Sequence, residues 1–302
     1  MNIGEWIEEL MEQVKAEIEK NGLEGNAELQ MVKKANDREL HVITIRSTKG
    51  NISPVMYINE LWDLHLKGES TKTLAEYVVC GYKGHCKKQE KFSDVLENKT
   101  ELLKHLRVRL VDSQYNQQYL NHCVHKEVEA GLALIAEARF DDKENFGFYS
   151  SVITQDLADT QNLDKEEVVA AGVENARNDE DGVKLFVLSK NIFNDKPDNV
   201  LGQELAKNEV FVLTTESQMC GTHIIVTRPD VMNDIRDQIG DFWIIPSSRH
   251  EVLVIAKEQE RLTPKQMLEM LRDANKEVVS DDDFFSDDLF QYTEHGLERY
   301  EI

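Results

Sequence analysis

The chain has 302 residues, 40% hydrophobic and 30% charged, a composition typical of globular proteins that is long enough for two domains. Its 57 acidic and 35 basic residues give a net charge of −22, which repels phosphate backbones and anionic lipids, so we expect neither a nucleic-acid partner nor membrane docking. No apolar run approaches the roughly 18 residues of a membrane helix, and four cysteines do not indicate a disulfide scaffold, so we expect a cytoplasmic protein.

The N-terminal part of the chain predicts one long helix, a hairpin and further helices. Apolar residues recur at helical spacing in the first segment, which is acidic and lacks the basic start of a signal peptide. The predicted strands cover residues 28–35, 39–46 and part of 51–57, with a turn at Asn36 and Asp37. The predicted helices cover residues 4–20, 59–68, 71–79 and 92–104. The polar segment 81–91 is predicted to be a loop.

The middle of the chain predicts strands followed by a capped helix. Residues 106–111 alternate like a strand, and residues 127–141 fit either a strand or an Ala-rich helix. We favour the strand, because residues 146–154 can then pair with it as a hairpin. Asp164, with Glu167 three residues later, predicts a capping box that starts a helix ending near residue 178.

The densest apolar runs lie in residues 209–256, which we interpret as the unit that organises the C-terminal part. The predicted strands of this unit are 209–215, 219–227, 242–246 and 251–256. A helix over 230–239 follows Pro229, and a final helix begins at Thr263 and Pro264. We therefore predict an α+β fold with mixed or antiparallel sheets and flanking helices. Two subdomains are expected, residues 1–90 and residues 91–302.

The turn after the third strand of this unit carries the most concentrated polar residues. Its candidate catalytic residues are Ser247, Ser248, His250 and Glu251, with His125 as a distant partner. Hydrolytic catalysis needs a nucleophile within hydrogen-bond reach of a base that a third group orients. Neighbours on one turn rarely reach that geometry, and no G-x-S-x-G motif is present. We therefore favour a structural role in which these side chains brace the ends of two strands.

Cysteines and histidines give no complete site either. Cys220 and His223 would point away from each other on the predicted strand, which favours an inert, buried thiol. The best metal-ligand set is Cys80, His85, Cys86, His122, Cys123 and His125. Its spacings do not match those of zinc sites, and H-E-x-x-H, a phosphate-binding glycine loop and G-x-G-x-x-G are absent. We expect no metal and no cofactor.

The C-terminal tail, residues 280–302, alternates acidic and aromatic residues. Phe284, Phe285 and Phe290 are candidate binding residues for a partner, because exposed aromatic clusters mark interaction segments. The alternative is that these rings pack onto the body of the protein. Both interpretations stay open at this point.

Several stretches together are similar to a known family. They are residues 52–59, the region of His125, residues 173–176, 212–215, 220–222, 242–252 and 287–302. With these stretches the chain resembles the bacterial family catalogued as domain of unknown function 5688, and more distantly a related bacterial family. It departs from the family pattern with Thr215 in place of Asn and with Gly221-Thr222 in place of Gly-Ala. The resemblance implies an α+β layout and carries no assigned activity.

These observations lead to two hypotheses about function. The first is a non-enzymatic binding or adaptor protein with a protein or small-molecule partner, whose surface includes residues 247–251 and the tail. The alternative is a hydrolase or transferase with a site around Ser248, His250 and Glu251. The hypotheses differ in whether His250 and His125 meet in one pocket beside a carboxylate.

Overall fold

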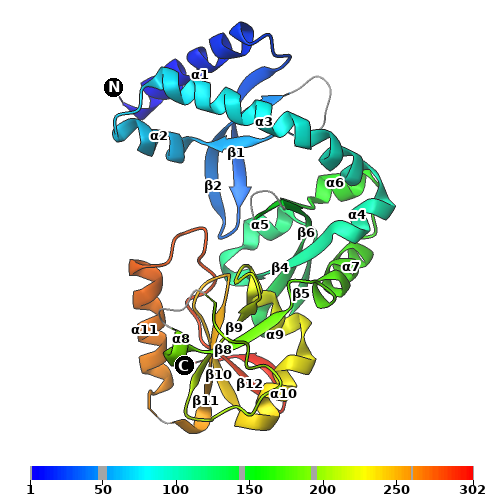
Figure 1. The fold of residues 1–302 in the computed structure, drawn as a ribbon, viewed down its shortest axis with the longest axis vertical. Helices are drawn as coiled ribbons and strands as arrows, with labels where there is room; N and C mark the ends of the chain where they lie inside the picture. The colour runs from blue at the N-terminus through cyan, green and yellow to red at the C-terminus, as the bar shows by residue number, and fades with distance from the viewer. Residues whose placement is uncertain (1, 47–52, 143–146, 192–195, 260, 302) are drawn as a thin grey trace. The chain divides into compact units, whose positions relative to one another are not determined.

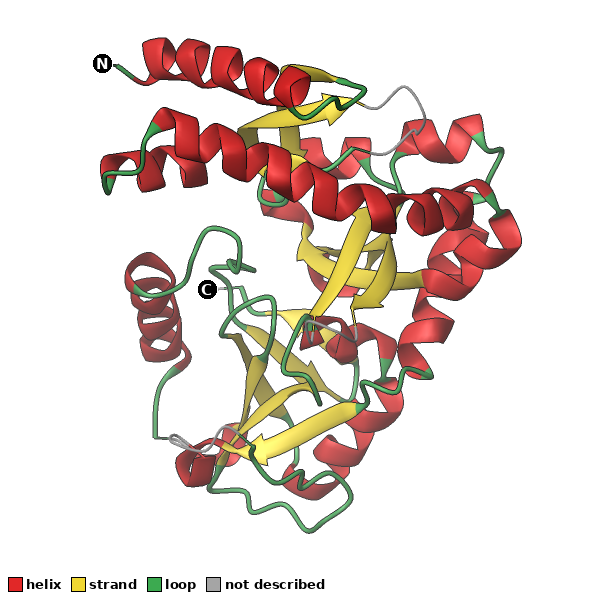
Figure 2. Cartoon of the chain, turned by 45° about the horizontal axis from the view of Figure 1, so that its top comes forward, coloured by secondary structure: helices red, strands yellow, loops and turns green. Residues whose placement is uncertain are grey.

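A computed structural model describes residues 2–46, 53–142, 147–191, 196–259 and 261–301, without the side chains of 85–93 and 141–149. The chain divides into two compact units, Met1–Leu102 and Leu103–Ile302, and each is described by itself. The expected boundary after residue 90 lies inside the helix α3 (Thr71–Glu97). Figure 1 traces the elements in chain order, and Figure 2 colours them by type.

The first unit is a three-stranded antiparallel sheet covered by helices. Its elements are α1 (Ile3–Lys20), β1 (Asn26–Lys34), β2 (Arg38–Arg46), β3 (Val55–Tyr57), α2 (Ile58–Leu66) and α3. The hairpin of β1 and β2 turns through residues 35–37, and Asn36 and Asp37 have positive φ, 64° and 50°, a conformation in which Asn and Asp are enriched. α1 and α3 pack together, and the apolar stripe of α1 enters the core through Trp6, Leu10 and Val14.

The predicted loop 81–91 is wrong, because this segment belongs to α3. It contains no proline, and its lysines and glutamine have good helix propensity. The two glycines at positions 81 and 84 lower that propensity without ending the helix. Ser70 starts α3 by accepting a hydrogen bond from the backbone N–H of Thr73.

The second unit contains two antiparallel sheets. The smaller one is built from β4 (Leu106–Asp112), β5 (His125–Val128), β6 (Leu132–Asp142) and β7 (Gly147–Val152). β6 pairs with the other three strands, and its pairing with β7 confirms the predicted hairpin. The single strand predicted over residues 127–141 is interrupted by a 3₁₀ turn, Glu129–Gly131, which separates β5 from β6. The helices of this part are α4 (Lys99–His105), α5 (Gln117–His122), α6 (Gln155–Thr160) and α7 (Lys165–Arg177). α7, capped by Asp164 as predicted, packs closely on β4 because Gly172 lies against the Arg107 carbonyl.

The larger sheet has six strands in the order β13-β12-β10-β11-β9-β8. Its strands are β8 (Val183–Val187), β9 (Val210–Thr215), β10 (Phe242–Pro246), β11 (Val252–Ala256), β12 (Phe290–Thr293) and β13 (Gly296–Arg299). The helices α10 (Pro229–Ile239) and α11 (Pro264–Glu277) lie on opposite sides of it (Figure 1). Trp243, Ile245 and Ile255 form a core with α11. The tail is thus part of this sheet, through β12 and β13. The α+β fold with antiparallel sheets is confirmed.

The strand predicted for residues 219–227 is wrong. This segment forms a 3₁₀ turn, η3 (Gly221–His223), followed by the short helix α9 (Ile224–Thr227). Cys220 has a left-handed backbone with φ of 55°, which ends extended geometry at this point. Ile224 and Ile225 are both buried, and one helical turn places them in the core as well as a strand would.

None of the helices in the described part of the chain combines the length and the apolar character that spanning a bilayer requires.

Candidate functional site

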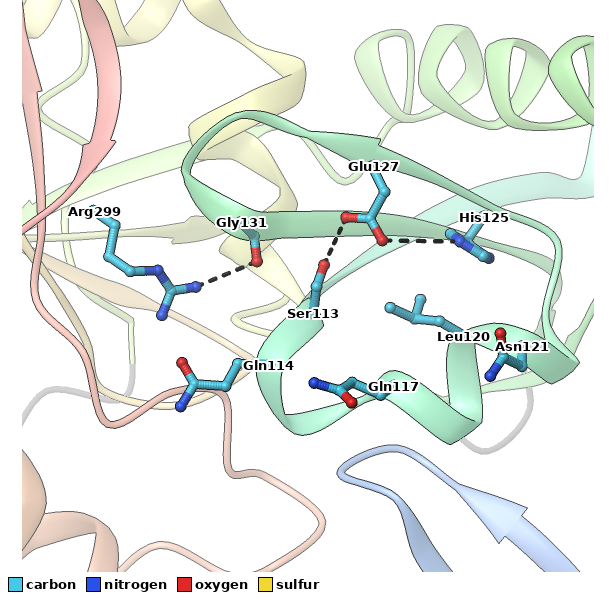
Figure 3. A pocket seen from close by; sticks show the side chains of 9 residues that line it. All are labelled: Ser113, Gln114, Gln117, Leu120, Asn121, His125, Glu127, Gly131 and Arg299. Atoms are coloured by element: carbon cyan, nitrogen blue, oxygen red, sulfur yellow. Dashed lines mark hydrogen bonds and ion pairs between the residues drawn. The ribbon is translucent and has the colours of Figure 1, made fainter.

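An open cavity of about 530 Å³ lies in the second unit, where β4 and β5 end (Figure 3). This volume falls in the range of small-molecule sites. The cavity is lined by Ser113, Gln114, Gln117, Leu120, Asn121, His125, Glu127, Gly131 and Arg299. Asp112 closes β4 and caps the following turn by accepting a hydrogen bond from the backbone N–H of Gln114. That turn and α5 then carry one wall, and β5 carries the other.

His125 and Glu127 alternate on β5 and point into the same side of the cavity (Figure 3). The Nδ1 atom of His125 lies 3.0 Å from the carbonyl oxygen of Cys123. A carbonyl only accepts, so Nδ1 carries a proton, and in the neutral form of the ring the lone pair lies on Nε2. That Nε2 lies 3.9 Å from Oε1 of Glu127, while the Ser113 hydroxyl donates to Oε2 of Glu127 at 2.7 Å. Two acceptors therefore face the cavity next to each other.

Arg299 brings a cation to the cavity rim, but all of its donors are used. A guanidinium has five N–H groups. Two go to the oxygens of Asp112 at 2.9 and 3.0 Å, and one goes to Asp288. The other two go to the carbonyl oxygens of Ala130 and Gly131 at 3.1 and 3.2 Å. Arg299 thus fixes the turn between β5 and β6, where Ala130 and Gly131 both have positive φ.

Three side-chain amides line the cavity without being engaged by the protein. Gln114, Gln117 and Asn121 are exposed, and within the part of the chain that the structure describes no hydrogen bond involves their side-chain amides. Each amide offers two donors and one acceptor oxygen. The arrangement can therefore bind a polar molecule that both accepts and donates hydrogen bonds, with Leu120 providing an apolar surface.

The turn 247–251, the candidate from sequence, lies away from this cavity and makes contacts within the protein. Ser247 donates to Glu251 at 3.2 Å, and the hydroxyl of Ser248 accepts from the backbone N–H of His250. The carbonyl of His250 accepts from the Thr214 hydroxyl and the backbone N–H of Gly221. None of the four candidate residues of this turn lines the cavity that contains His125.

The imidazole of His250 is held at both nitrogens. Nδ1 accepts from the backbone N–H of Cys220 at 3.0 Å, so the proton of the neutral ring lies on Nε2, which donates to Asp283 at 2.9 Å. Burial raises the pKa of the Asp283 carboxyl, but the hydrogen bonds from Ser280 and His250 and the charge of Arg249 together hold this pKa below its usual value. No nitrogen of this ring is left to deprotonate the hydroxyl of Ser248. The geometry is that of a brace between the turn, the segment at Cys220 and the tail.

The aromatic residues of the tail pack onto the protein. Phe285 and Phe290 are buried, with 3% and 0% of their surface exposed, and Phe290 belongs to β12. Phe284 is half-buried and contacts Tyr115 edge to face. Buried rings such as Phe285 and Phe290 contribute to the core and offer no surface to a partner.

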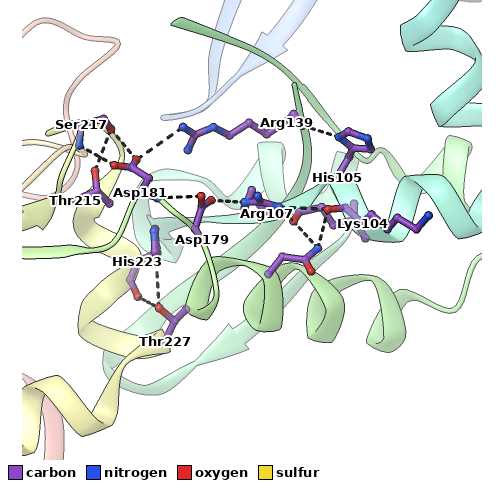
Figure 4. A network of polar contacts seen from close by, with 12 residues as sticks. Lys104, His105, Arg107, Arg139, Asp179, Asp181, Thr215, Ser217, His223 and Thr227 are labelled. Carbon is purple, nitrogen blue, oxygen red and sulfur yellow. Dashed lines mark hydrogen bonds and ion pairs between the residues drawn. The ribbon is translucent and has the colours of Figure 1, made fainter. Parts of the chain in front are cut away.

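A second polar cluster lies between the smaller sheet and η3 (Figure 4). Its ion pairs are Arg107–Asp179, Arg109–Glu137 and Arg139–Asp181. His223 is half-buried here, and its Nδ1 contacts the hydroxyl of Thr227 at 3.0 Å. Desolvation lowers the pKa of His223 to about 4, so its ring is neutral at physiological pH. The hollow has a volume of about 20 Å³, which is close to the space of one water molecule.

Cys220 and His223 both line this small hollow, contrary to the divergent arrangement expected of a strand. The correction follows from the 3₁₀ turn, which brings the two residues to the same side. Desolvation raises the pKa of the Cys220 thiol, so the sulfur is protonated and a poor nucleophile.

The candidate metal-ligand set is divided between the two units. Cys80 is exposed on α3 in the first unit, and the side chains of residues 85 and 86 lie outside the described residues. Cys123 is buried, and desolvation raises its pKa to about 12. Among the described residues, no group of three or more histidine, cysteine, aspartate or glutamate side chains is placed to hold a metal ion.

Sequence reasoning found His125 but missed most of the cavity. No helix was predicted where the structure has α5. The high density of Asn and Gln in residues 114–121 was the one sequence feature that could have indicated a polar binding site. The sequence around Arg299 does not indicate that this residue lines the cavity, because Arg299 reaches it only through the pairing of β13 with β12.

Comparison with known proteins identifies the family of this chain. No curated protein and no solved structure matches the chain. The model of the Family of unknown function (DUF5688) matches residues 3–294. This match covers nearly the whole chain and confirms the resemblance inferred from its motifs. The chain belongs to the Family of unknown function (DUF5688).

Proposed function

We propose that this protein is a non-enzymatic binding protein of the cytoplasm that holds a small polar molecule in the cavity of His125, Glu127 and Arg299. The observation that supports this most is the open volume of about 530 Å³ lined by side-chain amides that the protein itself does not engage. Polar groups converging on a preformed hollow are the usual construction of a ligand site. We therefore place the partner surface at this cavity instead of at residues 247–251 and the tail.

The geometry favours binding over hydrolysis. A hydrolase of the serine type needs a hydroxyl that donates to an imidazole. In the cavity the Ser113 hydroxyl donates to the Glu127 carboxylate instead, and the imidazole of His125 contacts that carboxylate at 3.9 Å. At the turn 247–251, both ring nitrogens of His250 are occupied. These contacts support a site that recognises its ligand through hydrogen bonds.

The test is a pair of tryptophan variants at neighbouring positions of α5. Gln117 lines the cavity and is exposed, so Gln117→Trp fills the hollow without disturbing the core. Gln118 is the next residue, is equally exposed and does not line the cavity, so Gln118→Trp is the matched control. Ligand-observed NMR with a panel of small amines, diols, amides and carboxylates measures binding to the wild type and to both variants.

The proposal expects at least one class of compound to bind the wild type and Gln118→Trp alike and to lose binding to Gln117→Trp. If every compound that binds does so equally to both variants, the ligand does not occupy this cavity. If none of the compounds binds the wild type at millimolar concentration, the proposal of a small polar ligand is abandoned.

A further inference from the structure

The charge of the cavity lining restricts the class of ligand. Arg299 is the only arginine or lysine among the lining residues that the structure describes. All five of its N–H groups donate to the protein, and three of them go to Asp112 and Asp288, the second of which also lies 3.8 Å from Arg272. An arginine recognises carboxylate or phosphate through free paired donors, and Arg299 has none to give. The cavity is therefore not built for an anion.

Beside the three side-chain amides, which offer both donors and acceptors, the available polar groups of the cavity are acceptors. Oε1 of Glu127 and Nε2 of His125 lie 3.9 Å apart and both face the hollow (Figure 3). One donor atom placed between them reaches both at about 2.9 Å, an ordinary hydrogen-bond length. An ammonium group has three N–H donors in a tetrahedral arrangement and can donate to both atoms at once. The third N–H is then free for an amide oxygen of the lining.

We propose that the ligand is a small organic cation whose primary ammonium group lies between the carboxylate of Glu127 and Nε2 of His125. This inference rests on the proposed function, because it names the ligand class of the same cavity. Ser113 is a positioning residue, since its hydroxyl holds the other oxygen of Glu127 at 2.7 Å and so orients the carboxylate. The three free amides of Gln114, Gln117 and Asn121 receive the remainder of the ligand.

The experiment compares three probes of equal length, 1,4-diaminobutane, 1,4-butanediol and succinate, which present ammonium, hydroxyl and carboxylate groups. Affinities are measured by NMR titration of the full chain in about 150 mM salt, where the screening length is about 8 Å. This salt reduces the general attraction of a protein with a net charge of −22 for any cation. The variants are Glu127→Gln, which removes the proposed ammonium acceptor, and Glu277→Gln. The latter removes the same charge from an exposed position at the end of α11, outside the cavity lining.

The expected result is that the diamine binds the wild type at least about tenfold more tightly than the diol, while succinate does not bind. Glu127→Gln is expected to weaken the diamine about tenfold, the loss of one charge-assisted hydrogen bond. Glu277→Gln is expected to change its affinity less than twofold. Equal weakening by both variants would mean that the diamine responds only to net charge, and this would overturn the inference.

The failure of this inference and the failure of the proposed function give different results. If the diol binds as tightly as the diamine, and Gln117→Trp abolishes the binding of both, the cavity is a ligand site but not one for ammonium groups. The same holds if succinate binds more tightly than the diamine. If Gln117→Trp leaves the affinity for all three probes unchanged, the site itself is rejected.

Discussion

At the scale of single residues, His223 shows how burial decides protonation. Its imidazole lies in the cluster of arginine–carboxylate pairs, and desolvation lowers its pKa to about 4. The surrounding Asp179 and Asp181 act in the opposite direction, and Arg107 and Arg139 act in the same direction as burial. Because the hollow beside it has room for only about one water molecule, the neutral ring is not placed to donate a proton to a substrate.

The depressed pKa of His223 predicts a stability that falls in acid. Between pH 6.5 and about pH 4 the unfolded chain binds a proton at this residue, whereas the folded chain does not, so acidification favours unfolding. A shift of this size corresponds to at most about 3 kcal/mol over that interval. In His223→Gln this contribution is absent, so the free energy of unfolding should depend less on pH between 6.5 and 4. Urea unfolding at a series of pH values measures it, and His295→Gln, at an exposed histidine, is the control. An identical pH dependence in wild type and His223→Gln would contradict the buried, neutral state.

At the scale of elements, the segment after β9 depends on a glycine. A Cβ atom added at Gly221 would lie 2.7 Å from the carbonyl oxygen of His250 and 2.7 Å from the Cα of Thr214. Both are backbone atoms, so they cannot turn away as a side chain can. The close approach lets the N–H of Gly221 donate to the His250 carbonyl at 2.9 Å. The packing of η3 against the turn 247–251 therefore requires a residue without a side chain at position 221.

Gly221→Ala is expected to lower the free energy of unfolding by about 1–3 kcal/mol, as overpacking of a close backbone contact does. Gly182→Ala is the matched control. No atom lies within 4 Å of the Cβ that it adds, and Gly182 has no positive φ. The control should be neutral or slightly stabilising, because alanine restricts the unfolded chain. Denaturant midpoints of the two variants provide the comparison. Equal stabilities would show that η3 can shift away from the turn 247–251 at no cost, and would contradict the requirement for a glycine at position 221.

The elements also show which parts of this fold can be inferred from sequence. Helices such as α1 and α11 were predicted well, because their apolar stripes and caps are local signals. The segment 219–227 has the composition of a strand, and only the left-handed Cys220 and the contacts of Gly221 direct it into a turn. Both residues contact His250, which for Cys220 lies 30 positions later, and no local pattern reports such a contact. The cavity was missed for the same reason, because Arg299 and Asp112 are 187 positions apart in the sequence.

At the scale of the whole molecule, each unit has a core of its own. The first unit buries Trp6 and Leu10 against α3, and the second buries its residues around two sheets. All residues that line the proposed site belong to the second unit. We therefore expect a fragment of residues 103–302 to unfold cooperatively by itself, as a unit with its own core does. Thermal unfolding followed by circular dichroism tests this, and a gradual, non-cooperative loss of signal would contradict the division.

The most direct test of the account is to find which residues respond to a bound ligand. The measurement is an ¹⁵N-resolved NMR titration of the full chain with 1,4-diaminobutane that follows the side-chain NH₂ groups of Gln114, Gln117 and Asn121. The account predicts that these three signals shift together with the backbone signals of His125 and Glu127, while residues 247–251 remain unchanged. Shifts confined to residues 247–251 and the tail, with the three amides unaffected, would contradict it.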